Sequence, residues 1–234
     1  RYYFTFLLLF IIKNLLAQIA LPTFHGIQKP DPPIPFVNYA IEFDGSGDNI
    51  QINGSDLNPP WTVEVWFKSI SNTHNSTLLW RCGSPCWALK LHQYNNTKKI
   101  GITKYGNTDW KWNYITSVGK WEHVVWVGKN NNVELFVNGV SKGTKNLSNA
   151  KLYWKYIGKS NGTLTFHGQI DELRIWNDAR TTAEIKSNMF KELEGNESNL
   201  KAYYKMSNGS GTTLTDNSTN SKNGTMKNGM NSND

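Results

Sequence analysis

The amino-acid sequence predicts an all-β protein, an antiparallel β-sandwich or jelly roll with one short helix before its closing strand. Short segments rich in β-branched and aromatic residues follow one another from residue 38, and Asn- or Gly-rich turns separate several of them. One stretch, near residue 181, carries the start signal of a helix. The 234 residues include 10 Trp, 10 Tyr and 10 Phe, enough to fill the core of one domain.

Each expected strand is recognised by alternation or by its β-branched and aromatic content. The first two, 38–43 and 49–52, flank the turn "DGSGD". Hairpin signals lie at "KNNN" (129–132) and at Asn138-Gly139. The further expected strands are 61–69, 77–81, 87–94, 99–105, 121–128, 132–139, 151–158 and 163–176. Short strands at this spacing are typical of a sandwich or jelly roll.

A helix is expected to begin at Thr181, because Thr181 and Glu184 form the capping-box pattern Thr-x-x-Glu. The expected helix "TTAEIKSNMFKEL" ends before Gly195, since glycine commonly terminates helices. The next segment, "NLKAYYKMS" (199–207), alternates between apolar and polar residues. It is predicted to be the closing strand.

The start of the chain resembles a secretory signal peptide over residues 1–17. Arg1 is followed by an apolar run from Tyr2 to Ile12, and Ala17 supplies a small residue at the expected cut. The apolar run is shorter than the ~20 residues that a membrane-spanning helix needs. We therefore expect a secreted or cell-surface protein with no membrane span in the mature chain.

The domain itself is expected at residues 37–207. Residues 18–36 hold five prolines, which favour extended chain, and are predicted to be a linker. Residues 208–234 are rich in Asn, Ser, Thr and Gly and offer little to bury. They are predicted to be a polar tail or the start of a further linker.

The chain is basic, with a formal net charge of +7, but its charges are scattered among Asn, Ser and Thr. A nucleic-acid-binding protein usually clusters them on one element. We therefore expect a solvated basic surface and no nucleic-acid partner.

The two cysteines, Cys82 and Cys86, flank Gly-Ser-Pro. In the oxidising environment of an exported protein they are predicted to form a disulfide across a tight turn. The chain-entropy relation gives such a short loop about 2 kcal/mol of stabilisation. Free thiols and a metal site are the alternatives, and a zinc site would need further ligands because the chain has no other cysteine.

Six segments follow the order of motifs in a known family. They are "YAIEFDGSGDNIQI", "WTVEVWFK", "WEHVVWV", "VELFVNGV", "HGQIDELRIWNDARTTAEI" and "LKAYYKMSNGSGTTLTDNSTNSKNGT", which together cover about residues 38–226. The chain thus resembles the bacterial laminin G-like jelly rolls of the concanavalin A-like lectin/glucanase superfold. The resemblance implies two packed antiparallel sheets, a secreted or cell-surface location, and often a structural Ca²⁺ near the chain ends.

The same resemblance implies a non-catalytic module that binds carbohydrate or an extracellular protein, in an oligomeric state that the sequence does not reveal. The alternatives are a protein-adhesion module of a larger multidomain protein and an accessory domain of a glycoside hydrolase. Glycosidases of this superfold carry two glutamates flanking an aspartate on one strand face. In this chain Gln169 and Leu173 are in phase with Asp171, so the paired carboxylates of usual glycoside hydrolysis are not expected.

The candidate ligand-binding residues are Trp110, Trp112 and Tyr114, which alternate along "DWKWNY" and so share one side of an extended segment. Aromatic rings stack well on sugar faces and on flat partner surfaces. The alternative is that the three rings cover the core between the sheets. Exposure of the rings decides between these interpretations.

A calcium site is predicted from Asp171. If Leu173 and Ile175 face the core, strict alternation places the Asp171 carboxylate on the same inward side. Calcium takes six to eight oxygen ligands and tolerates irregular loops. Asp44 and Asp48 of "FDGSGDN" are the other candidate ligands, with backbone carbonyls of that turn. The alternative is that hydrogen bonds alone satisfy Asp171.

Overall fold

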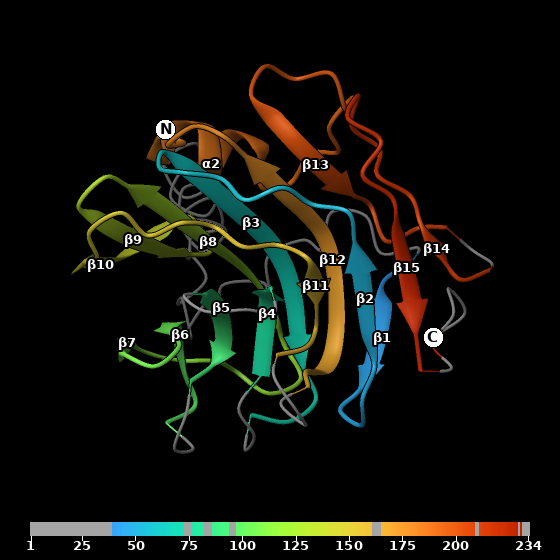
Figure 1. Cartoon of the computed structure of the whole chain (residues 1–234), viewed down its shortest axis with the longest axis horizontal. Coiled ribbons are helices and arrows are strands. Elements are labelled where there is room, and N and C mark those ends of the chain that lie inside the picture. Colours follow the sequence, from blue (N-terminus) through green and yellow to red (C-terminus); the bar gives the residue numbers. More distant parts are fainter. Residues whose placement is uncertain are drawn as a thin grey trace, which may run out of the picture. The chain divides into compact units, whose positions relative to one another are not determined.

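The computed structural model describes residues 39–72, 76–81, 86–93, 97–160, 165–208, 211–228 and 230. Within these ranges two antiparallel β-sheets pack face to face (Figure 1), which confirms the predicted sandwich. The predicted signal peptide, the Pro-rich linker and Cys82 lie outside the described residues, so those three predictions stay predictions. No helix in the described ranges is long and apolar enough to cross a membrane.

The first sheet has seven strands, in the order β1-β12-β3-β8-β9-β10, with β13 also paired to β12. β1 pairs with the first half of β12, and β13 pairs with its second half. The strands are β1 (Ile41–Asp44), β12 (His167–Trp176), β3 (Trp61–Ser69), β8 (Trp121–Lys129), β9 (Asn132–Val137), β10 (Val140–Asn146) and β13 (Leu200–Tyr204).

The second sheet has eight strands, in the order β14-β15-β2-β11-β4-β5-β6-β7. Strands distant in sequence are neighbours here, as β2, β11 and β4 show. The strands are β14 (Thr213–Leu214), β15 (Gly224–Lys227), β2 (Asn49–Ile52), β11 (Tyr156–Ile157), β4 (Ser76–Trp80), β5 (Trp87–His92), β6 (Lys99–Lys104) and β7 (Thr108–Ile115).

The core lies between the two sheets and is built from alternate residues of their strands. Val63, Val65 and Phe67 of β3 belong to the same buried cluster as Ile50 and Ile52 of β2. Phe166 links the layers near one end, because its ring lies 5.9 Å from the ring of Phe43 and 6.2 Å from that of Phe67. The period-two pattern of the sequence therefore marks the buried face correctly in these strands.

The sandwich extends beyond the C-terminal boundary that the sequence predicted. Gly224–Lys227 (β15) pairs with β2, and Thr213–Leu214 (β14) pairs with β15. Asp216 holds the connecting loop, because its carboxylate accepts hydrogen bonds from the backbone N–H groups of Ser218 (2.9 Å) and Lys222 (2.7 Å). The prediction of a polar tail from residue 208 is therefore wrong for these residues. A polar segment needs few apolar side chains when it joins an existing sheet edge through backbone hydrogen bonds.

The helix α2 (Thr182–Asn188) has the predicted capping box, with Thr181 as N-cap and Glu184 as its partner. It ends at Asn188, several residues before Gly195. Side chains of the seven-stranded sheet bind the carbonyl groups around this end: Arg174 Nη1 donates to Asn188 O (2.9 Å) and Trp66 Nε1 to Met189 O (2.8 Å). These tertiary hydrogen bonds replace the continued helix that the local sequence predicted.

A β-bulge in β12 interrupts the alternation from which Asp171 was expected to face the core. The register against β3 shifts between Asp171 and Arg174, and Glu172 has a φ of 51°. Leu173 and Ile175 do belong to the core cluster, but so does Ile170. The bulge inserts one residue, so Asp171 lies on the opposite side from Leu173. The predicted inward position of Asp171 is therefore wrong.

Candidate functional site

A row of aromatic rings crosses the outer face of the eight-stranded sheet. Trp80 pairs with Tyr156, and Tyr156 pairs on its other side with the exposed Gln51. Side chains alternate along a strand, and the neighbours Leu79, Ile157 and Ile50 are fully buried between the sheets, so the row lies on the outer side of its sheet. Trp80 is itself buried and packs in the same hydrophobic cluster as these neighbours. The ring of Trp80 lies 5.7 Å from that of Tyr156 and 6.3 Å from that of Tyr105. Tyr105 and Tyr156 are half-buried, whereas Trp80 is 5% exposed.

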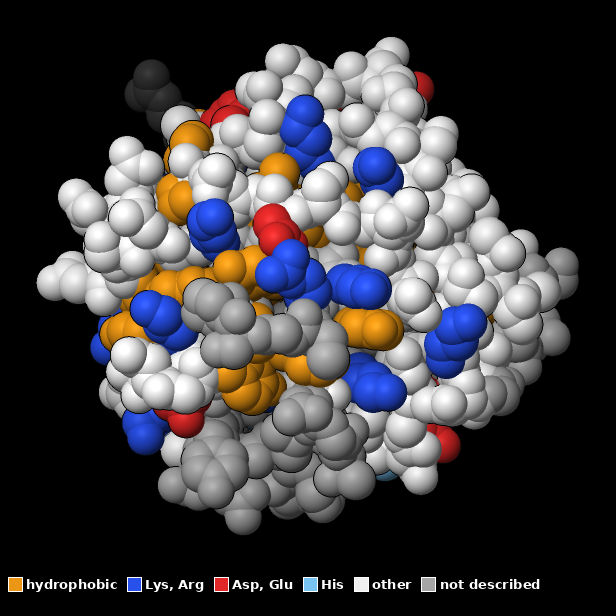
Figure 2. Space-filling model, viewed as in Figure 1, with side chains coloured by type: hydrophobic (Ala, Val, Ile, Leu, Met, Phe, Trp, Pro, Cys, Tyr) orange, Lys and Arg blue, Asp and Glu red, His pale blue; other side chains and the backbone are white. Residues whose placement is uncertain are grey.

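Basic side chains lie beside these rings. Lys155 Nζ is 5.9 Å from the centre of the Tyr156 ring, and Lys90 Nζ is 5.8 Å from the centre of the Tyr105 ring. Arg81 directly follows Trp80 and stacks over Tyr153 at 4.5 Å. We call Trp80, Tyr105 and Tyr156, with Arg81, Lys90 and Lys155, the aromatic–basic face. Figure 2, which looks onto this sheet, shows hydrophobic side chains gathered near the middle with Lys and Arg around them.

A polar network lies under the middle of this face. Lys90 Nζ donates to Thr77 Oγ1 (2.7 Å), and Thr103 Oγ1 donates to Asp109 Oδ1 (2.6 Å). Burial lowers the pKa of Lys90 to about 8, although the nearby Asp109 carboxylate opposes this shift. Gly101 lies in the same layer as this network. A Cβ added at Gly101 would lie 2.5 Å from the Trp110 carbonyl oxygen. This layer is therefore close-packed, and Lys90, which is 2% exposed, belongs to it. The half-buried Tyr105 and Tyr156 and the exposed Lys155 are the parts of the face that are open to a ligand.

The structure does not bring Trp110, Trp112 and Tyr114 to one open surface. Trp112 is 1% exposed and its indole Nε1 donates to Gly143 O (2.7 Å) in the neighbouring sheet. Trp110 is half-buried and stacks on Trp87 at 5.5 Å, while the half-buried Tyr114 donates a hydrogen bond to Glu122. Trp112 is therefore a core residue, and Trp110 and Tyr114 offer only part of their rings to solvent.

The three predicted calcium ligands are also separated. Asp44 pairs with His167, and Asp171 lies four residues further along β12, about 13 Å at the usual rise of a strand. Asp44 and Asp48 do share the turn after β1, where Asp48 Oδ2 accepts from Asp44 N (2.9 Å) and Asp44 Oδ1 accepts from Ser46 N (2.6 Å).

No group of three His, Cys, Asp or Glu residues in the described ranges could hold a metal ion. The predicted set of Asp44, Asp48 and Asp171 therefore does not fit one calcium ion. Calcium at the turn of Asp44 and Asp48 alone stays a prediction. A calcium-dependent rise in melting temperature that Asp48→Asn removes would confirm it.

Asp171 lies instead in a buried ionic cluster on the outer side of the seven-stranded sheet, together with Glu64, His123, Glu172 and Arg174. Arg174 Nη2 donates to Glu172 Oε2 at 2.6 Å and Arg174 Nη1 lies 4.0 Å from Glu64 Oε2. Burial raises the pKa of Asp171 to about 8 and raises that of Glu172, the nearby Arg174 guanidinium opposing both shifts. Each member is at most 5% exposed. A polysaccharide therefore cannot reach these carboxylates.

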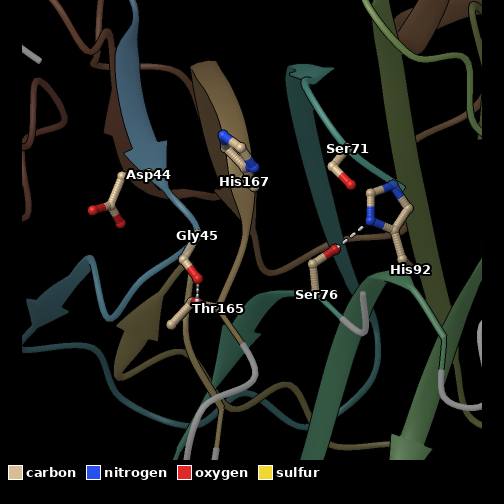
Figure 3. A pocket seen from close by; sticks show the side chains of 7 residues that line it. All are labelled: Asp44, Gly45, Ser71, Ser76, His92, Thr165 and His167. Carbon is tan, nitrogen blue, oxygen red and sulfur yellow. Dashed lines mark hydrogen bonds between the residues drawn. The ribbon is translucent and has the colours of Figure 1, made fainter. Parts of the chain in front are cut away.

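A small cavity of about 90 Å³ lies near the end of β1, between His167 and the pair His92 and Ser76 (Figure 3). Ser76 Oγ lies 2.7 Å from His92 Nδ1, while His92 Nε2 contacts the hydroxyl groups of Ser69 (3.1 Å) and Thr116 (2.9 Å). Burial lowers the pKa of His92 to about 4, so its ring is neutral. No carboxylate orients this ring among the described contacts, which distinguishes the arrangement from a Ser-His-Asp triad.

In the described ranges, two antiparallel sheets with the short helix α2 outside them define a jelly-roll sandwich, and its candidate site is an aromatic surface on one sheet. The chain belongs to the concanavalin A-like lectin/glucanases superfamily, because the family model Laminin_G_3, which carries this description, matches residues 44–186. This confirms the resemblance seen in the sequence. A comparison with curated proteins gave no match.

Two solved structures share the fold. One is a protein from Bacteroides ovatus that is provisionally described as a carbohydrate binding protein, with a TM-score of 0.66 and 20% identity over 81% of this chain. The alignment spans 58% of that protein's length. The other is domain 4 of AbnA, a GH43 extracellular arabinanase from Geobacillus stearothermophilus, in complex with arabinotriose. Its TM-score is 0.53, with 20% identity over 63% of this chain and 75% of that domain.

Proposed function

We propose that this chain is a non-catalytic module that binds carbohydrate on the aromatic–basic face. The observation that carries the proposal is the pair of half-buried rings of Tyr156 and Tyr105, with the nearly buried ring of Trp80 between them, on the outer side of the eight-stranded sheet. Flat rings can pack against the C–H face of a sugar, while hydroxyl and ammonium groups at their edges bond the sugar hydroxyls. The buried position of the Asp171 and Glu172 carboxylates supports a role without catalysis.

The two structural neighbours support the same class of ligand. The Bacteroides ovatus protein is provisionally described as carbohydrate binding, and the AbnA domain is described in complex with arabinotriose. AbnA is an extracellular enzyme, and our chain carries a predicted signal peptide at residues 1–17. We therefore extend the proposal to a secreted or cell-surface location, where the module would bring an attached protein to a glycan. Adhesion to an extracellular protein is the alternative.

A glycan array tests the proposal. The wild-type chain should bind a subset of polysaccharides, and Tyr156→Ala should weaken that binding about tenfold, which corresponds to about 1.4 kcal/mol. Tyr39→Ala is the matched control, because Tyr39 is 57% exposed and lies just before β1 of the other sheet. Loss of binding in both variants, or in neither, would contradict the assignment. Binding to extracellular proteins without any glycan would favour the adhesion alternative.

The purified chain and the polysaccharides that it binds also test the proposal that the module is non-catalytic. The purified chain, incubated with every polysaccharide that it binds, should release no reducing sugar. Turnover that survives Tyr156→Ala would show a reactive site away from the aromatic–basic face.

A further inference from the structure

We infer that the ligand is an internal stretch of an extended, unbranched polysaccharide that runs across the strands of the eight-stranded sheet; this inference rests on the proposed carbohydrate-binding function. A row of directly paired residues crosses five strands of this sheet, from its β14 edge to β4 (Figure 1). We call this row the polar–aromatic track. It consists of Thr213, Thr225, Gln51, Tyr156 and Trp80.

The polar half of the track lies on the same outer side of the sheet as Tyr156. Thr213, Thr225 and Gln51 are exposed, whereas the next residue along each of their strands is buried in the core cluster. These buried neighbours are Leu214, Met226 and Ile52. Side chains alternate along a strand, so the three exposed residues point away from the core. The track is therefore open to solvent from the sheet edge as far as Tyr156.

The two halves of the track offer different contacts to a ligand. Tyr156 and, beyond the buried Trp80, Tyr105 present rings on which sugars can stack. The threonine hydroxyl groups and the Gln51 amide can both donate to and accept from sugar hydroxyls. All five side chains of the track are uncharged at neutral pH. Stacking and hydrogen bonds along one line suit successive sugars of a single chain.

The spacing of the strands fits such a chain. Neighbouring strands lie about 4.8 Å apart, which is close to the length of one sugar unit in an extended glycan. Five strands therefore give a track about 19 Å long, with room for about four or five sugars. The track runs out to the last strand of the sheet, β14, so a longer chain can continue past the edge. Recognition along such a track does not require a chain end.

A series of oligosaccharides of increasing length tests the inference. The series are made from the linear polysaccharides that the chain binds, beginning with arabino-, xylo- and cello-oligosaccharides of one to six units, and are titrated by calorimetry. We expect the affinity to rise with each added sugar up to about four or five units and then to level off. Full affinity for a single sugar, or binding confined to branched glycans, would overturn the inference and retain carbohydrate binding. Absence of binding to every glycan would overturn both.

Shortening a bound polymer separates internal binding from recognition of a chain end. At equal mass of sugar, partial hydrolysis multiplies the chain ends but leaves nearly the same length of internal chain. The shortened polymer should therefore compete for the protein as well as the intact one does. Competition that increases in proportion to the number of ends would overturn the inference.

A double variant assigns the length dependence to the polar half of the track. Gln51→Ala with Thr225→Ala should weaken the binding of a hexasaccharide about tenfold through lost hydrogen bonds. It should leave the binding of a disaccharide, which the aromatic rings can hold alone, unchanged. Thr144→Ala with Ser148→Ala is the matched control, because both residues are exposed in or just after β10 of the other sheet. Equal losses in both double variants, or no loss in the first, would overturn the inference.

Discussion

Replacing Asp171 by Asn should stabilise the protein near neutral pH. The Asp171 carboxyl has a pKa of about 8 instead of its ordinary 3.8, because burial and the adjacent Glu172 carboxylate disfavour its charge. Between these two values the folded protein keeps a proton that the unfolded chain has lost. The free energy of unfolding therefore falls as pH rises, by at most about 1.4 kcal/mol per pH unit.

The magnitude follows from that slope. From pH 5 to pH 7 this one group would cost about 2.7 kcal/mol of stability. Asparagine cannot ionise, yet it keeps a carbonyl oxygen at the position where Asp171 Oδ1 accepts from Glu172 N (2.8 Å), so the bulge should survive. The variant should therefore exceed wild type in stability at pH 7, and the difference should vanish towards pH 4.

Urea unfolding of both proteins at pH 4, 5, 6 and 7 measures this difference. Glu64, His123, Glu172, Arg174 and Glu192 surround the site and are present in both proteins, so most of their own titration cancels between the two curves. Two parallel curves would refute the reasoning, because they would show that Asp171 has the same proton affinity in the folded and unfolded chain.

Three further predictions concern single side chains. The folded-state pKa of Lys90, about 8 against 10.5, predicts that wild-type stability rises between pH 8 and pH 10, and that Lys90→Met lacks this component in urea unfolding. Trp112→Ala should cost about 3–5 kcal/mol in chemical denaturation, since the ring is fully buried, whereas Trp110→Ala should cost distinctly less. Thr181→Ala should cost about 1 kcal/mol through loss of the capping box, measurable as a lower thermal midpoint with unchanged glycan binding.

Patterns of residues close together in the sequence predicted the strands and the helix start that depend on such short-range interactions. The β-branched and aromatic content of residues 61–69 predicted the strand β3, and the spacing of Thr181 and Glu184 predicted the helix start. The bulge at Asp171 was not predicted. It is a register shift between β12 and β3, and that pairing cannot be read from the sequence of β12 alone. The β15 strand was not predicted because its polar sequence lacks a hydrophobic pattern. It forms a strand through its pairing with β2.

The sequence did not point to the aromatic row for a related reason. Trp110 and Trp112 stand out in the sequence because they are close together, but their strand directs Trp112 into the core. Tyr156, Trp80 and Tyr105 come from three separate segments, and only the order of β11, β4, β5 and β6 brings them into one row. Cross-strand order of this kind cannot be seen in a single sequence.

The most direct test of the central claim is an NMR titration that follows the tryptophan indole N–H signals while a bound glycan is added. The signal of Trp80, identified by its loss in Trp80→Phe, should shift, because its buried indole lies between the rings of Tyr156 and Tyr105, on which the glycan would stack. The signal of Trp112, hydrogen-bonded in the core, should stay in place. A glycan that binds without moving the Trp80 signal, or that moves only those of other tryptophans, would contradict the account.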